Sequence, residues 1–241
     1  MKAILFDLDG TLLPMVQEEF IEAYMQVLVR KLCSLGFAPE GLAKSVWKST
    51  SAMINNDGKR SNEEVFWNTF HSLVKEDTGR FREISDAFYS GEFHQVKAAT
   101  QDNPLAAQTV RLARKKADLV VLATNPLFPG TAQESRLSWI GLSREDFDLI
   151  TSFETDSYCK PNPEYYRCVC RRIGVKPEEC LMIGNDERED MHPASDLGMD
   201  CFLVTDWVIR DKRYPWEGKT GSAEELLRFL NALPDRKEGL T

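Results

Sequence analysis

The sequence contains no apolar run long enough to cross a bilayer. Its longest apolar stretches, such as residues 119–123, fall far short of the roughly 20 residues that a spanning helix needs. The amino terminus passes from Lys2 through four apolar residues directly to Asp7, which leaves no room for the apolar segment of a signal peptide. We therefore expect neither a membrane protein nor a secreted one.

Cysteine and histidine are too scattered to suggest a metal centre or a disulfide framework. The six cysteines include no C-x-x-C pair, and Cys168 and Cys170, two residues apart, would face different directions on a helix. The three histidines show no spacing typical of metal ligands. A structural zinc site is therefore not expected, and we predict reduced thiols in a cytoplasmic protein.

The charge balance is acidic, with 30 basic and 38 acidic side chains and a formal net charge of −8. An acidic chain repels a polyphosphate backbone, so we expect no nucleic-acid partner. The hydrophobic content of 42% is ordinary for a folded protein. A length of 241 residues allows one or two domains.

Short apolar runs alternate with amphipathic segments along most of the chain. Runs bounded by polar residues are typical of strands buried on both faces, and the alternation predicts an α/β fold with a Rossmann-like, doubly wound parallel sheet. Ser222 and Glu225 have the spacing of a capping box, and Gly174 follows a predicted helix. The expected strands are 3–6, 118–123, 147–152, 180–183 and 201–204, and the expected helices are 104–116, 131–139, 163–173, 188–197 and 222–233.

One interval breaks this alternation. Between residues 15 and 101 the sequence favours helices and no convincing strand, and the interval is too long for a single crossover connection. We predict an all-helical domain, 15–101, inserted into an α/β core domain formed by 1–14 and 102–241. Its expected helices are 17–35, 39–54, 61–75 and 80–89.

Polar residues follow the predicted strands where a ligand site would form. In open α/β sheets, ligands bind outside the carboxyl ends of the strands. Four separate groups of polar residues would meet at this one edge, which is difficult to ascribe to coincidence. The groups are Asp7, Asp9, Gly10 and Thr11; Thr124 and Asn125; Lys160; and Asp186 with Asp190.

Such a cluster of carboxylates needs cations. Two like charges 4 Å apart repel by about 4 kcal/mol at an effective dielectric constant of 20. Lys160 is one candidate cation, and Mg²⁺, which prefers oxygen ligands, is the other. Gly10 would let the backbone approach a phosphate closely, and Thr11 would offer a hydroxyl and an N–H. Together these groups suit phosphoryl oxygens.

The spacing of Asp7 and Asp9 constrains the backbone conformation between them. Asp7 and Asp9 would point to opposite sides of a regular strand. For both side chains to reach one ligand, the chain must leave strand geometry near Leu8, and Gly10 makes such a turn plausible.

These residues resemble the four ordered motifs of the haloacid dehalogenase (HAD) superfamily. The motifs read Asp7-Leu8-Asp9-Gly10-Thr11, then Thr124, then Lys160, then Gly184-Asn185-Asp186-x3-Asp190. The match covers the whole chain in order and spacing. The helical insertion resembles the C1 cap of the superfamily, which lies between the first and second motifs.

The resemblance implies a role for each motif residue. Asp7 would be the nucleophile that takes the phosphoryl group. Asp9 would protonate the leaving oxygen and then activate the hydrolytic water. Thr124 would hydrogen-bond the phosphoryl group, and Lys160 would neutralise its charge.

The resemblance also implies a Mg²⁺ site. Asp7 and Asp186 would hold the ion by their side chains, and Asp9 by its backbone carbonyl. Asp190 would support the water shell of the metal or orient Lys160.

We therefore predict a Mg²⁺-dependent phosphatase that hydrolyses a small phosphorylated metabolite through an aspartyl-phosphate. A phosphomutase or a dehalogenase of the same superfamily is the alternative enzyme. A non-catalytic phosphate-binding regulatory protein is the alternative from another class. The physiological substrate and the oligomeric state stay open.

Three further interpretations concern side chains near this site. Asn125 would contact substrate or cap the turn into Pro126. The segment Trp207–Gly218 would line the mouth of the site or, as we favour, form a surface excursion or a contact between copies. Four aromatic residues of the insertion are expected to fill its core: Trp47, Phe66, Trp67 and Phe70.

Overall fold

Strand β1 (Ala3–Phe6) lies at the centre of a six-stranded sheet with the order β3-β2-β1-β4-β5-β6. All five neighbouring pairs are parallel, and Phe6 is level with Leu122 on one side and Ile183 on the other. The computed structural model describes residues 1–37, 41–74 and 78–236. The other strands are β2 (Leu119–Leu122), β3 (Leu149–Ile150), β4 (Cys180–Gly184), β5 (Asp200–Val204) and β6 (Thr220–Gly221).

Helices cover both faces of the sheet, which confirms the doubly wound α/β fold. Ile4 and Phe6 belong to the core that contains α5 (Ala106–Lys116) and α9 (Ala223–Ala232), whereas Ala3 and Leu5 pack with α7 (Pro163–Ile173) and α8 (His192–Asp196). Successive residues of a strand point to opposite faces, so an entirely apolar strand serves both layers. The remaining elements of this part are α6 (Gly130–Trp139), η2 (Arg144–Asp146), η3 (Pro177–Glu179) and η4 (Glu187–Met191).

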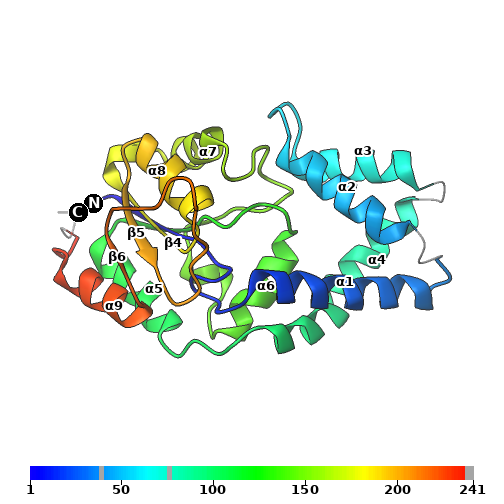
Figure 1. Cartoon of the computed structure of the whole chain (residues 1–241), viewed down its shortest axis with the longest axis horizontal. Coiled ribbons are helices and arrows are strands. Elements are labelled where there is room, and N and C mark those ends of the chain that lie inside the picture. The colour runs from blue at the N-terminus through cyan, green and yellow to red at the C-terminus, as the bar shows by residue number, and fades with distance from the viewer. Residues whose placement is uncertain (38–40, 75–77, 237–241) are drawn as a thin grey trace.

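A helical cap is inserted between β1 and α5, and it extends beyond the carboxyl ends of the central strands (Figure 1). The chain leaves and returns at adjacent points, because Met15 and Thr100 form an antiparallel bridge and the Gln101 N–H donates to the Pro14 carbonyl. The exact limits of the cap, 15–101, stay a prediction. Its elements are α1 (Gln17–Ser34), α2 (Leu42–Ile54), α3 (Asn62–Leu73), α4 (Thr78–Ser90) and η1 (Glu92–Ala99).

Asn62, at the first turn of α3, docks the cap onto the core. Its side chain is fully buried and donates to the Pro126 carbonyl, 3.1 Å away, and to the Cys159 sulfur. The backbone N–H groups of Asn62 and Glu63 donate to carbonyls of Asp156 and Phe153. The cap therefore closes over loops that follow β2 and β3.

Some predicted boundaries differ from the structure. The predicted helix 188–197 is divided into η4, a turn of wide π type, and the short α8. The division arises because the N–H groups of Asp190 and Met191 both donate to the Asp186 carbonyl. Strand β6 was not expected. The predicted start of one cap helix at Pro39 and the end of another at Lys75 lie outside the described residues.

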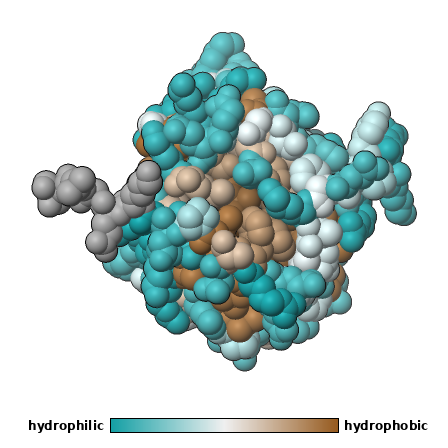
Figure 2. All heavy atoms as spheres, turned by 90° about the vertical axis from the view of Figure 1, so that its left-hand side faces the viewer, coloured by the Kyte–Doolittle hydropathy of each residue, from teal (hydrophilic) through white to brown (hydrophobic). Residues whose placement is uncertain are grey.

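The end of the molecule opposite the cap carries the amino terminus and α9, and Figure 2 views it directly. Hydrophilic residues surround a central area of more apolar ones there. In the described part of the chain, no helix has both the length and the apolarity of a membrane span. All six cysteines are free thiols, whereas the cytoplasmic location stays a prediction.

Candidate active site

Asp7 and Asp9 line the same cavity because the chain leaves strand geometry directly after Phe6. The Asp7 N–H still pairs with the Ile183 carbonyl, as in a sheet, but the next residues form a tight loop. The N–H of Leu13 returns to the carbonyl of Leu8, 2.8 Å away. This loop turns the Asp9 carboxylate toward that of Asp7, as expected from the spacing of the two residues.

Lys160 joins two carboxylates from distant parts of the sequence. Its ammonium lies 2.8 Å from Asp7 Oδ1 and 2.6 Å from Asp190 Oδ1, and its side chain is 1% exposed. Burial opposes the charge of Lys160, but Asp190 and Asp7 outweigh it and hold the pKa of the ammonium well above its usual range. The other oxygen of Asp190 accepts N–H bonds from Asn185 and Asp186. Asp190 is thus fixed as an orienting partner of Lys160.

Thr11 supports Asp7, and neither Gly10 nor Thr11 lines the cavity. The Thr11 hydroxyl lies 3.2 Å from both Asp7 Oδ2 and Asn185 Oδ1. The N–H of Thr11, which we expected to be free for a phosphate, donates to Leu8 inside the loop, and that of Gly10 donates to Leu13. Closing the loop engages both donors, and contact of Gly10 and Thr11 with a phosphate stays a prediction.

Thr124 and Asn125 follow β2 and line the cavity next to the carboxylates. The Thr124 carbonyl accepts hydroxyl bonds from Thr151 and Tyr165, which hold this turn against the core. Asn125 accepts the N–H of Lys160 and donates to Glu189 at 2.9 Å. Asn125 therefore ties the strand end to the loop that carries the lysine.

Asp186 completes the acidic edge of the cavity. Its Oδ1 accepts the N–H groups of Arg188 and Glu189, which fixes the carboxylate, and burial raises its pKa. Among the described residues, no group of three or more His, Cys, Asp or Glu side chains is arranged to hold a metal. Mg²⁺ is usually bound by one or two carboxylates together with water and substrate oxygens. A donor set of Asp7, Asp186 and a nearby backbone carbonyl fits this usual coordination of Mg²⁺.

Arg136, on α6, is a site residue that the sequence did not reveal. Its side chain has no exposed surface and pairs with Asp9 Oδ2, and it also donates to Gln133 and to the Ala132 carbonyl. The guanidinium lies 4.6 Å from the centre of the Phe128 ring. An arginine in a short polar helix carries no signal of burial, so only the folded chain identifies it.

The surroundings of Asp9 shift the pKa of its carboxyl group in opposite directions. Burial raises its pKa, Arg136 lowers it, and the nearby Asp7 raises it again, with a raised pKa as the outcome. Oxygen Oδ1 of Asp9 is buried and has no hydrogen-bond partner within the described structure. A carboxyl group whose pKa is raised, beside the cavity, suits proton donation.

Glu189 is the second residue that the sequence reasoning missed. It lines the cavity, and burial raises its pKa to about 7. Its place three residues after Asp186, at the start of a helical turn, resembles an ordinary helix-terminal charge, which conceals its position in the site.

The first part of the segment after β5 lies against the site, as the less favoured of the two interpretations of this segment held. The Trp207 carbonyl accepts a 2.7 Å bond from the Asn185 side chain, and Ile209 lines the cavity. Arg210 and the Asp211 N–H bind the buried carboxylate of Glu187. Backbone pairing of Ile209 with Asn185 draws this segment onto the site.

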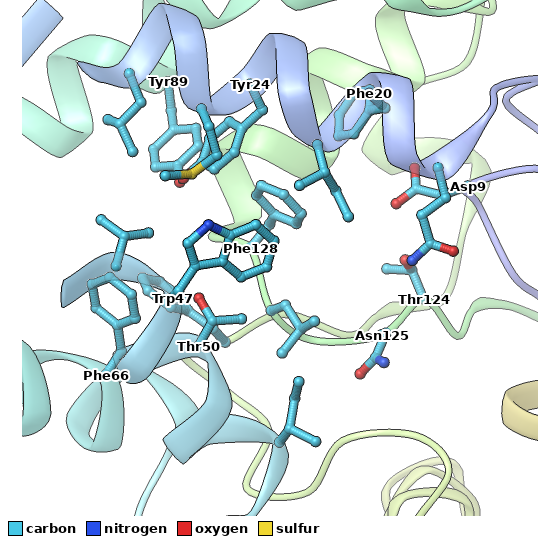
Figure 3. Close-up of a pocket in the computed structure, with 18 of the residues that line it drawn as sticks. Asp9, Phe20, Tyr24, Trp47, Thr50, Phe66, Tyr89, Thr124, Asn125 and Phe128 are labelled. Carbon is cyan, nitrogen blue, oxygen red and sulfur yellow. The ribbon is translucent and has the colours of Figure 1, made fainter. Parts of the chain in front are cut away.

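The cavity has a volume of about 290 Å³ and extends from these carboxylates into the cap. Figure 3 shows Asp9, Thr124 and Asn125 at one end and Tyr24, Trp47, Phe66 and Tyr89 toward the other. Phe70 is buried, whereas Phe66 and Trp67 are partly buried in the cap core. The expectation for Trp47 is wrong, because this residue is 50% exposed and lines the cavity.

A family model described as haloacid dehalogenase-like hydrolase matches residues 1–198. The chain belongs to this family. The match confirms the resemblance drawn from the four motifs, and it confirms that the protein is an enzyme of the hydrolase class. The HAD-like chain carries the motif residues at the carboxyl ends of β1, β2 and β4 and in the loop between β3 and α7, beneath the cap.

Relatives and solved structures extend the comparison. The HAD-like chain is 25% identical over 217 residues to a glyceraldehyde 3-phosphate phosphatase of Methanothermobacter thermautotrophicus, covering 88% of this chain and 89% of the relative. A HAD phosphatase of Thermococcus onnurineus has a similar fold, with a TM-score of 0.60, 22% identity, and 97% and 99% of the two chains covered. A 2-haloacid dehalogenase of Pseudomonas syringae also has a similar fold, with a TM-score of 0.62 and 20% identity. The alignment covers 96% of this chain and 98% of the dehalogenase.

Proposed function

We propose that the protein is a Mg²⁺-dependent phosphatase that hydrolyses a small phosphomonoester through an aspartyl-phosphate on Asp7. One observation carries the proposal: the Asp7 carboxylate, held by Lys160 and Thr11, lines a cavity that Asp9 lines as well. The hydrolase family and the phosphatases among its relatives support this class of reaction.

In the first step, an oxygen of Asp7 attacks the phosphorus, and the bond from phosphorus to the alcohol oxygen breaks. Asp9 gives its proton to that oxygen, so the alcohol leaves neutral. The ammonium of Lys160, 2.8 Å from Asp7, offsets the repulsion between the carboxylate and the incoming phosphoryl group. Thr124, which lines the cavity, would hydrogen-bond the phosphoryl oxygens.

In the second step, Asp9 accepts a proton, whereas it donated one in the first step. Its carboxylate takes a proton from a water molecule as the water oxygen bonds to phosphorus. The bond between phosphorus and Asp7 then breaks, which releases phosphate and restores both carboxyl groups. Arg136 holds Asp9 in place through both steps.

Asp7 and Asp186 would hold Mg²⁺ by their side chains, with the Asp9 carbonyl as a further ligand. The bound ion supplies positive charge for the phosphoryl oxygens. Asp190 has both oxygens engaged, with Lys160 and with two backbone N–H groups. We therefore assign Asp190 to the orientation of Lys160.

Asp9 also favours a phosphatase over a dehalogenase, since a halide leaves without a proton and needs no acid. The expected substrate is a small phosphorylated molecule, because the cavity has a volume of about 290 Å³ and extends into the cap. Nucleic acid is not an expected partner of this acidic chain.

Hydrolysis of p-nitrophenyl phosphate tests the proposal. We expect turnover with Mg²⁺, no turnover after chelation, and restoration on adding Mg²⁺ back. A non-catalytic phosphate sensor would release no nitrophenol under any of these conditions. Asp118→Asn, an exposed carboxylate at the opposite end of β2, is the matched control for substitutions of site carboxylates and should retain full activity.

A further inference from the structure

The cap end of the cavity is built from carbon-rich side chains. Aromatic rings from four cap helices, α1 to α4, line it, and Phe128 from the core completes the wall (Figure 3). Aliphatic groups from α1, α2 and α4 fill the spaces between the rings, among them Met25, Ile54 and Ile84. The main aromatic side chains are Phe20, Tyr24, Trp47, Phe66, Trp67 and Tyr89.

Charge is distributed very unevenly along this cavity. Five carboxylates line the core end, and of the described residues that form the wall none is lysine, arginine or histidine. Lys160 and Arg136 lie behind the wall, where they pair with Asp7 and Asp9. A second anionic group on a substrate would therefore enter the cap without a cation to receive it, at a cost in desolvation.

Two apolar side chains in the wall are unusually exposed. Trp47 is 50% exposed and Ile54 is 43% exposed, although both belong to the lining. A ligand with an apolar body would cover these surfaces and gain the free energy of removing them from water. The hydroxyl groups of Tyr24 and Tyr89 bond each other at 2.8 Å, so each already has one hydrogen-bond partner without a ligand.

We infer that the substrate is the phosphomonoester of an apolar alcohol, alkyl or arylalkyl, with no second charged group. This inference rests on the proposed phosphatase activity. The phosphoryl group would lie among Asp7, Thr124 and Asp186, and the apolar body would extend toward Trp47. An engineered cavity of about 150 Å³ accommodates benzene. A volume of about 290 Å³ therefore suits a phosphoryl group with a short chain or one ring.

A series of alkyl phosphates tests the inference. Ethyl, butyl and hexyl phosphate have leaving alcohols of similar acidity, so differences in kcat/KM report binding in the cavity and not the ease of bond cleavage. We expect kcat/KM to rise about fourfold per added methylene, on the order of a hundredfold from ethyl to hexyl phosphate. Phosphoglycolate, which carries a carboxylate, should fall below ethyl phosphate.

Two variants and one control variant locate the effect in the cavity wall. Trp47→Ala should lower the ratio of kcat/KM for hexyl to ethyl phosphate by about tenfold, and Leu73→Ala should leave that ratio unchanged. Leu73 is the matched control because it is an exposed apolar residue of α3 outside the cavity wall. Thr50→Arg, which adds a cation to the wall, should raise the ratio for phosphoglycolate to ethyl phosphate.

The outcomes separate the two proposals. Turnover of the series without dependence on chain length, or a preference for phosphoglycolate, would overturn the apolar substrate class and leave the phosphatase proposal intact. Absence of turnover with every phosphomonoester would overturn the phosphatase proposal, and the substrate class with it.

Discussion

Asp9 and Arg136, 127 residues apart in the chain, form an ion pair beside the cavity. The guanidinium has no exposed surface, whereas the Asp9 side chain is 26% exposed and lines the cavity. Gln133 and the Phe128 ring hold the arginine from its other sides. Arg136 is therefore a rigid support that directs the Asp9 carboxyl group toward the ligand.

Arg136→Met should lower kcat for alkyl phosphates by about tenfold to a hundredfold, part of what a general acid contributes. The loss should be smaller with p-nitrophenyl phosphate, because its leaving group needs little protonation. Steady-state kinetics with both substrates measure the contrast. Arg111→Met, at an exposed arginine of α5, is the control. An equal loss with both substrates would contradict a positioning role for Arg136.

Lys160→Met should destabilise the protein by about 3–5 kcal/mol, because it leaves the buried carboxylates of Asp7 and Asp190 without their cation. Urea unfolding of the metal-free protein at pH 8 measures this loss. Lys219→Met removes an ion pair whose side chains are more than half exposed, and it should cost under about 1 kcal/mol. Similar losses for the two variants would show that Lys160 is not an essential internal cation.

Glu189→Gln should stabilise the metal-free protein at alkaline pH. Burial raises the pKa of Glu189 from 4.5 to about 7, so the folded state favours the protonated carboxyl group. Relative to glutamine, the stability of the wild type therefore falls as pH rises from about 4.5 to about 7. The variant should be more stable by about 3 kcal/mol at pH 8 and by less than about 1 kcal/mol at pH 5. A gap that does not change with pH in urea unfolding would contradict the assignment.

Gly10→Ala should impair both folding and turnover. Gly10 has a φ of +82°, and an added Cβ would lie 2.2 Å from the side-chain nitrogen of Asn185. Gly141 has a φ of +70° with open space around it, so Gly141→Ala incurs only the backbone cost of about 1–2 kcal/mol. Thermal unfolding should show a larger loss for Gly10→Ala. Equal losses would show that Asn185 moves aside freely.

The core fold was predictable because its strands are short, apolar and buried on both faces. Helix ends were predictable where local chemistry decides them. Ser222 and Glu225 form the expected capping box at the start of α9, and Gly174 ends α7 with a φ of +66°. Strand β6 was missed because two residues, Thr220 and Gly221, pair only through tertiary contacts with β5.

The acidic cluster was predictable because its members follow strands whose carboxyl ends meet at one edge. Arg136 and Trp47 could not be predicted as site residues. Helical periodicity does not distinguish their positions from those of residues outside the site. A polar helix conceals the burial of Arg136, and an apolar ring at a helical position suggests core, although Trp47 faces a cavity. The supporting roles of Gly10 and Thr11 depend on hydrogen bonds inside a loop, which spacing alone does not encode.

The central claim is that Asp7 forms a covalent bond to phosphorus, and trapping that intermediate tests it most directly. The enzyme would be mixed with a phosphomonoester and Mg²⁺, quenched in acid and digested, and the phosphorylated peptide identified by mass spectrometry. We predict phosphate on Asp7, accumulation of this species in Asp9→Asn, and its absence together with turnover in Asp7→Asn. Phosphate on another residue, or normal turnover by Asp7→Asn, would contradict the account.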